Sequence, residues 1–255
     1  MDLLFLLLLA LIGLLAGAFA GVSGTGGGSF ILPALMFLFG FPASLAIGTT
    51  LFVVFFTVVS GGYTHMRKKN VDMKTCKWLM MGGLIGVLIG SYVFTMIVNE
   101  SSLMNLLLGL IFMIPALKIV YDSIKNPEMN TEGDRIEGDK HQKGVIGVAN
   151  GFLSGIVGTG GGYALVPTLI IAFEAPVYTT MGTTLFSMIP VAGLGAAIKL
   201  FEGYVDLQVG IVLVLGTMIG ARLSSERIKN FEPHILKLIF GLFFLGISMK
   251  YLGVF

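Results

Sequence analysis

The stretch GVSGTGGGSFILP, residues 21–33, decides the fold because the chain contains it twice. Gly17–Pro33 aligns with Gly151–Pro167, GFLSGIVGTGGGYALVP, at an offset of 134 residues. The same offset aligns two further pairs of segments, Gly48–Leu51 with Gly182–Leu185 and Val71-Asp72 with Val205-Asp206. An offset that persists for about seventy residues indicates a duplicated module. We therefore expect each half of the chain to form one structural unit.

The composition excludes an ordinary water-soluble globular domain. Hydrophobic residues make up 55% of the 255 residues, charged residues only 12%, and the mean hydropathy is +0.93. These values are typical of an integral membrane protein. The net charge of +2 does not suggest a nucleic-acid partner, and the single cysteine, Cys76, excludes an intramolecular disulfide. No basic residue precedes the first apolar run, so we interpret that run as a mature helix rather than a signal peptide.

Apolar runs divide each half into five segments. They cover residues 3–20, 29–39, 43–64, 78–98 and 103–121, then 144–157, 163–173, 177–199, 207–221 and 235–252. The segments 29–39 and 163–173 are shorter than the roughly 20 residues that cross a bilayer, so each either spans incompletely or is re-entrant. The prediction is an all-α integral membrane protein of two inverted-topology repeats. Each repeat has a glycine-broken helical hairpin followed by three transmembrane helices, giving about 8–10 membrane segments. The first repeat covers residues 1–125, a linker 126–143, and the second repeat 144–255.

The distribution of basic residues supports the inversion. An odd number of segments in each half makes the second half enter the membrane in the opposite sense. Every lysine and arginine except Lys199 and Lys250 lies in the regions 67–77, 118–143 and 222–237. The positive-inside rule places these regions in the cytoplasm. We therefore expect a multi-pass protein of the cell (inner) membrane, with both termini extracytoplasmic and the linker 126–143 cytoplasmic.

The glycine-rich breaks are the predicted substrate site. Unpaired backbone groups cost several kcal/mol each in hydrocarbon, so a non-helical segment there must be paired within protein or face a wet cavity. In secondary transporters such breaks meet near the midplane. The half-helix after each break begins with free amides that carry about half a positive charge, which suits an anion.

Backbone amides, hydroxyls and two basic side chains complete the predicted site. The candidate substrate-binding residues are Ser23, Thr25, Gly26, Gly27, Gly28, Ser29, Thr49 and Thr50 in the first half, and Thr159, Gly160, Gly161, Gly162, Thr183, Thr184, Lys199 and Arg222 in the second. Lys199 either guides anions at the outer mouth or extends its charge to the membrane surface. Arg222 either contacts the anion or anchors the topology. Close helix packing is the alternative role for the glycines. A phosphate-binding loop is excluded because no lysine follows either break.

These motifs resemble the sulfite exporter TauE/SafE family of bacterial and archaeal membrane permeases. The resemblance rests on two copies of G-x-G-G-G-x-x-x-x-P (Gly24–Pro33 and Gly158–Pro167), on Ala46–Leu51 with its counterpart Met181–Leu185, and on Ile219–Leu223, IGARL. It covers nearly the whole chain. It implies export or uptake of a sulfur-containing anion such as sulfite or an organosulfonate.

The titratable residues predict no other chemistry. No Asp, Glu or His lies in the middle of a predicted span, so no proton relay is expected. Outward movement of an anion is favoured by about 2.3 kcal/mol per charge per 100 mV, so export needs no coupling ion. His65, His141 and His234 lack metal-ligand spacing. We expect no metal, no cofactor and no enzymatic activity. The alternatives are a passive anion channel, a permease for another small anion, a membrane enzyme and a role in assembly.

Overall fold

The computed structural model describes residues 3–125, 133–227, 241–242 and 245–253, and over these residues the protein is all-helical without strands. The helices are α1 (Leu3–Ser23), α2 (Gly28–Pro33) continued by a π-helical turn η1 (Ala34–Leu38), α3 (Ala43–Arg67), α4 (Met73–Ile97), α5 (Ser101–Lys125), α6 (Lys140–Val157), α7 (Gly162–Phe173), α8 (Val177–Phe201) and α9 (Leu207–Glu226). Among them α1, α3, α4, α8 and α9 are long and apolar enough to cross a membrane. The chain is therefore an all-helical integral membrane protein, as predicted. The predicted segment 235–252 lies largely outside the described residues.

The offset found in the sequence recurs in the helix boundaries. Helices α3 and α8 begin 134 residues apart, at Ala43 and Val177, and both contain 25 residues. Helices α4 and α9 begin at Met73 and Leu207, again 134 residues apart. Each of these two helices starts directly after an aspartate. The Asp72 carboxylate accepts from the amides of Lys74 and Thr75, and the Asp206 carboxylate accepts from the amide of Val209. Such N-caps fix where a helix begins, so the repeat in sequence becomes a repeat in structure.

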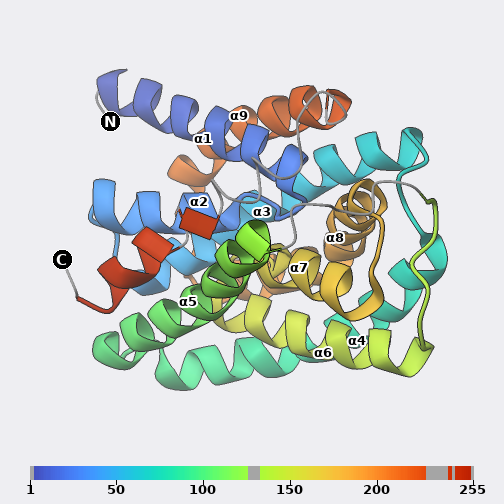
Figure 1. Ribbon diagram of the computed structural model, residues 1–255. Coiled ribbons are helices and arrows are strands. Elements are labelled where there is room, and N and C mark those ends of the chain that lie inside the picture. The colour runs from blue at the N-terminus through green and yellow to red at the C-terminus, as the bar shows by residue number, and fades with distance from the viewer. Residues whose placement is uncertain (1–2, 126–132, 228–240, 243–244, 254–255) are drawn as a thin grey trace.

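Two outer helix pairs enclose a central layer (Figure 1). Helix α1 packs along α9, and α4 packs along α6, while α3 and α8 cross between the two pairs. Glycines bring the paired backbones together. A Cβ atom at Gly17 of α1 would collide with the carbonyl of Thr217, and a Cβ at Gly151 of α6 would collide with the carbonyl of Gly83. Small residues permit this close approach in membrane proteins.

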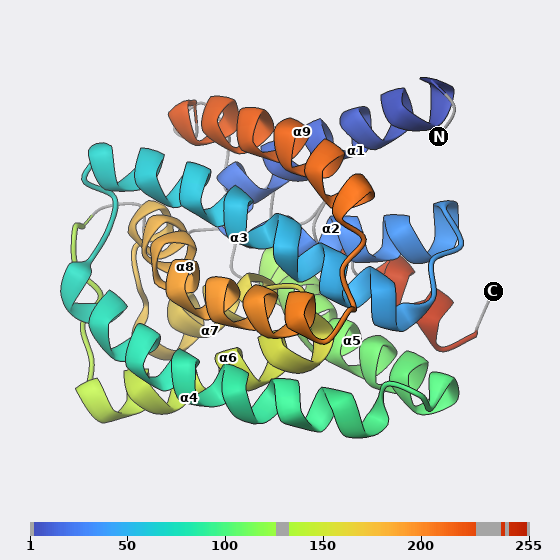
Figure 2. The same ribbon diagram turned by 180° about the vertical axis from the view of Figure 1, so that it is seen from behind.

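The loops that follow the two crossing helices lie at opposite ends of the helix bundle (Figure 2). Residues 68–72 and the described part of the linker, 133–139, lie at one end, which we call the α3–α4 end. Residues 202–206 and the start of α1 lie at the other, which we call the α8–α9 end. The two surface loops of equivalent sequence position are thus separated by the length of the bundle.

Asp72 ties the linker to the α3–α4 end. Its Oδ2 atom accepts from the Thr75 hydroxyl at 2.7 Å and from the amide of Ile136 at 3.0 Å. Burial alone would raise the pKa of Asp72, but the hydrogen bonds from the Thr75 hydroxyl and from three backbone amides outweigh it and hold the pKa below its ordinary value. Lys143 donates to the same Thr75 hydroxyl at 2.9 Å.

Helix α6 begins within the predicted linker. It starts at Lys140, whereas the apolar pattern indicated a start near Gly144. The reason is local, because the Asp139 carboxylate accepts from the amides of His141 and Gln142 at 3.1 and 3.3 Å. This N-cap adds a polar first turn that hydropathy does not detect.

Candidate functional site

Both glycine breaks have the same unusual backbone. Gly24, Gly26 and Gly27 have φ angles of 72°, 78° and 77°, and their counterparts Gly158, Gly160 and Gly161 have 72°, 76° and 76°. This left-handed conformation is readily available only to glycine. In each half the third of these glycines is the N-cap of the following helix, α2 or α7. The two breaks therefore repeat the same local structure.

The two breaks lie against each other in the centre of the molecule. A Cβ atom at Gly28 would lie 2.7 Å from the Thr159 Cα, and a Cβ at Gly162 would lie 2.7 Å from the Thr25 Cα. Both breaks also contact the side chain of Met188, because Cβ atoms at Gly26 and Gly160 would lie 2.9 and 2.5 Å from its Cε. Because Gly26, Gly28, Gly160 and Gly162 have no side chains, the backbones of the two breaks can contact each other and the Met188 side chain of α8.

Four predicted hydroxyls near the breaks are buried without a hydrogen-bond partner. Ser29 and Thr159 belong to the breaks, Thr50 and Thr184 to the crossing helices, and all four residues are fully buried. A buried polar group left unsatisfied costs about 1–3 kcal/mol. The exceptions within the breaks are Ser23 and Thr25, whose hydroxyls lie 2.7 Å from each other.

Thr49 and Thr183 are engaged elsewhere. The Thr183 hydroxyl accepts from the amide of Asp72 at 2.9 Å, and the Thr49 hydroxyl accepts from the amide of Asp206 at 2.9 Å. Each therefore joins a crossing helix to the turn that follows the other crossing helix. These two hydroxyls hold the halves together, while their neighbours Thr50 and Thr184 leave theirs unpaired.

Lys199 is fully buried near the end of α8. Its Nζ atom lies 3.2 Å from the centroid of the Phe94 ring and 3.7 Å from Oε2 of Glu202, and it has no hydrogen-bond partner. The side chain therefore does not extend to the surface. A buried cation over an aromatic face is partly compensated by the ring.

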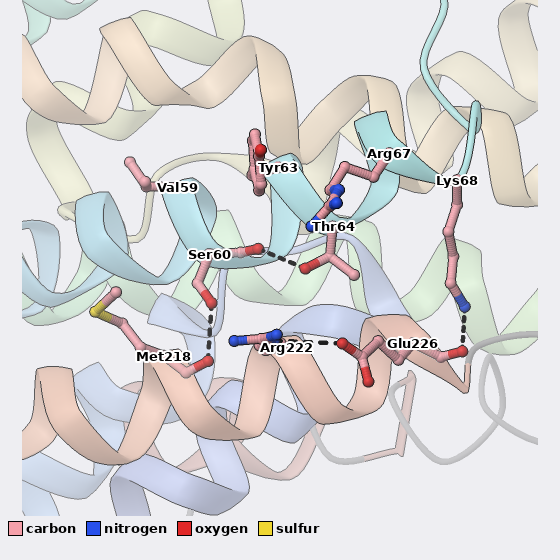
Figure 3. Close-up of a pocket in the computed structure, with 9 residues that line it drawn as sticks. All are labelled: Val59, Ser60, Tyr63, Thr64, Arg67, Lys68, Met218, Arg222 and Glu226. Carbon is pink, nitrogen blue, oxygen red and sulfur yellow. Dashed lines mark hydrogen bonds and ion pairs between the residues drawn. The ribbon is translucent and has the colours of Figure 1, made fainter.

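Arg222 lies apart from the glycine breaks. It lines a groove of about 500 Å³ between α3 and α9, together with Tyr63, Arg67 and Lys68 and without any residue of either break (Figure 3). Its side chain is 70% exposed and pairs with Glu226 at 3.3 Å. Of the predicted site residues, Arg222 is the one that the fold places on an open surface groove.

His65 and the serine pair Ser91 and Ser225 are buried polar residues that were not predicted from the sequence as site residues. His65 is fully buried, with Nε2 3.2 Å from the carbonyl oxygen of Gly21 and Nδ1 without a partner. It occupies the position equivalent to Lys199. Ser91 and Ser225 are equivalent to each other, and both hydroxyls are buried and unpaired. The repeat offset itself was the signal that could have identified these pairs. Among the described residues, no group of three or more His, Cys, Asp or Glu side chains is arranged to hold a metal.

The sequence profile described as sulfite exporter TauE/SafE matches residues 9–251. The chain belongs to the sulfite exporter TauE/SafE family. Similar relatives include the probable membrane transporter proteins YdhB and YunE of Bacillus subtilis (strain 168). YdhB is 30% identical, with 90% of this chain and 93% of the relative covered, and YunE is 26% identical, with 97% and 98% covered. A probable membrane transporter protein of Methanocaldococcus jannaschii is 27% identical, with 93% and 91% covered.

Membership in the TauE/SafE family confirms the resemblance drawn from the glycine motifs and makes the protein a membrane transporter of this family. The match to the family spans both halves, so each glycine break lies within it. No solved structure matches the chain.

Proposed function

We propose that the protein is a permease that moves a small sulfur-containing anion, such as sulfite or an organosulfonate, across the cell (inner) membrane. The observation that carries this proposal is the meeting of two glycine breaks beside four fully buried, unpaired hydroxyls. Unsatisfied donors in a membrane interior are costly and are typical of substrate pathways. A substrate rich in oxygen acceptors would satisfy them.

The local chemistry favours an anion. The first-turn amides of α7, a helix of 12 residues, have no partner within the helix and carry the positive end of its dipole. The Thr159 hydroxyl lies in the break directly before this helix and is unpaired. Sulfite presents three oxygens, so amides and hydroxyls from both breaks can bind it at once. The glycines permit the backbone itself to approach the anion.

The arrangement of the halves supports alternating access. The halves exchange equivalent contacts, and the α3–α4 and α8–α9 loops lie at opposite ends (Figure 2). With the basic α3–α4 end in the cytoplasm, the two repeats have inverted topology and both termini are extracytoplasmic. Rocking of one repeat against the other would then open the central site to each side in turn. Export down the membrane potential needs no coupling ion.

Reconstitution tests this function. The purified protein is placed in liposomes, and efflux of radiolabelled sulfite is followed at a clamped membrane potential, with sulfate and taurine as competitors. Saturable efflux supports the permease, and the competitors rank substrate classes. Efflux that rises linearly with concentration favours a passive channel built on the same site. Absence of flux under every gradient contradicts the proposal.

A further inference from the structure

Two ionisable side chains occupy equivalent positions at the ends of the crossing helices. His65 of α3 and Lys199 of α8 are 134 residues apart, and both are fully buried. His65 Nδ1 and Lys199 Nζ have no hydrogen-bond partner. The backbone around them is also equivalent, since the carbonyl of His65 accepts from Asn70 at 3.0 Å and that of Lys199 from Tyr204 at 2.9 Å. The two residues thus lie near the last turns of α3 and α8, at opposite ends of the helix bundle.

The residues one turn further along have opposite charges. Glu202 follows Lys199, and its carboxylate lies 3.7 Å from the Lys199 ammonium. The residue equivalent to Glu202 is Lys68, which follows His65 and donates to the backbone carbonyl of Glu226 (Figure 3). At the α8–α9 end, the buried Lys199 is therefore followed by a carboxylate, Glu202. At the α3–α4 end, the buried His65 is followed by a second basic side chain, Lys68.

The difference extends to the surface of the two ends. Arg67, Lys68 and Arg222 line the groove at the α3–α4 end, where they outnumber its one carboxylate, Glu226. The counterparts of Arg67 and Arg222 in the other half are apolar: Phe201, which is 90% exposed, and Leu88, which is 51% exposed. The α3–α4 end thus attracts anions, and the α8–α9 end contains one buried cation with a carboxylate of its own.

The contact between Lys199 and Glu202 is weak enough for another anion to replace the Glu202 carboxylate. At 3.7 Å it is an ion pair but not a hydrogen bond. The Glu202 side chain is 29% exposed, whereas Lys199 is fully buried. A buried charge needs a partner, and the partly exposed carboxylate can move away without unfolding the helix. A substrate anion can therefore take its place at the ammonium.

We propose that Glu202 competes with the transported anion for Lys199 and thereby promotes anion release at the α8–α9 end. The inference rests on the proposed permease function and adds to it a regulatory residue and a difference in affinity between the two sides. The arriving anion pairs with Lys199 as Glu202 moves aside, and the returning carboxylate expels it. Because the position equivalent to Glu202 is Lys68, the buried His65 has no carboxylate at the equivalent position, and the one carboxylate that lines the groove at the α3–α4 end, Glu226, pairs with Arg222. Affinity is thus lower at the α8–α9 end and release there is faster, while the electrochemical gradient of the anion sets the direction of net movement.

The test compares E202Q with a matched control, E100Q, which removes the same charge from an exposed position between α4 and α5, at the α8–α9 end. Sulfite flux is measured in both directions with right-side-out and inside-out membrane vesicles. For E202Q, the half-saturating sulfite concentration at the α8–α9 side is expected to fall about tenfold, because Lys199 loses its competitor. The value at the α3–α4 side should remain that of the wild type, and E100Q should match the wild type on both sides.

A second variant tests whether Glu202 acts through Lys199. In a double-mutant cycle, E202Q should have no effect in the K199M background. The inference is overturned if E202Q changes the half-saturating sulfite concentration no more than E100Q does, or if its effect persists in the K199M background. Saturable flux in the wild-type protein would still support the permease in either case. Absence of saturable flux in the wild type instead overturns the proposed function and this inference with it.

Discussion

The hydroxyl of Thr183 in α8 accepts a hydrogen bond from the backbone amide of Asp72, the N-cap of α4, at 2.9 Å. The same bond recurs between Thr49 and Asp206, also at 2.9 Å. Each half thus holds the interhelical turn of the other, and the two bonds act at opposite ends of the bundle. The two glycine breaks lie between these two hydrogen bonds.

Removing either of these two hydrogen bonds should destabilise the protein. T183V leaves the buried amide of Asp72, and T49V the partly buried amide of Asp206, without its acceptor, which costs about 1–3 kcal/mol. Thermal unfolding in detergent should show a lower midpoint for both variants by a similar amount. The control T168V, at an exposed position of α7 where the hydroxyl bonds only to its own helix, should unfold like the wild type. Unchanged midpoints for both T183V and T49V would show that these hydrogen bonds do not hold the two halves together.

Side chains in the glycine breaks should abolish transport. A Cβ at Gly27 would lie 2.7 Å from the Ala16 carbonyl oxygen, a Cβ at Gly161 would collide with the Asn150 side chain, and both backbones are left-handed. G27V and G161V should therefore insert in the membrane but lose sulfite flux. G144V is the matched control, because its Cβ would meet no atom within 4 Å. Flux retained in G161V would contradict the site assignment and favour a packing or assembly role.

The unpaired hydroxyls allow function to be separated from stability. T50V and T184V replace buried hydroxyls that have no partner by a methyl group of similar size. Removing an unsatisfied polar group should leave stability unchanged or raise it by about 1 kcal/mol. Sulfite flux should nevertheless fall about tenfold if these donors bind the anion. Full flux in both variants would show that the hydroxyls take no part in transport.

Acid should weaken the linker contact through Asp72. Its pKa is held below the ordinary value in the folded protein, so the stabilisation is present above the unfolded pKa of about 4 and is lost as the pH falls through the folded pKa. D72N retains a capping oxygen but no charge. Its unfolding midpoint should therefore decline less than that of the wild type between neutral pH and pH values below about 4. If the unfolding midpoints of the wild type and D72N decline equally as the pH falls, Asp72 is not the source of the acid sensitivity.

Much of this architecture could be predicted from the sequence because it depends on local signals. The doubled GTGGG motif gave the two breaks, and apolar runs located the helices from α1 to α9. The role of Thr49 and Thr183 could not be predicted, since adjacent threonines have identical local patterns and only the opposing turn distinguishes them. The position of Arg222 depends on which face of α9 packs against α1.

Burial of ionisable groups was also beyond local reasoning. Lys199 and His65 lie near the ends of helices, where a surface position is the ordinary expectation. Their burial depends on neighbours distant in sequence, the Phe94 ring for Lys199 and the Gly21 carbonyl for His65. Such contacts follow from the packing of two repeats and not from either segment alone.

Counterflow tests the central claim most directly. Proteoliposomes loaded with unlabelled sulfite are diluted into a trace of labelled sulfite at zero membrane potential, and internal label is followed over time. A permease with one central site of alternating access should accumulate label transiently above its equilibrium level, and G161V should not. Label that rises only to equilibrium, with flux proportional to concentration, would contradict a carrier built on the glycine breaks.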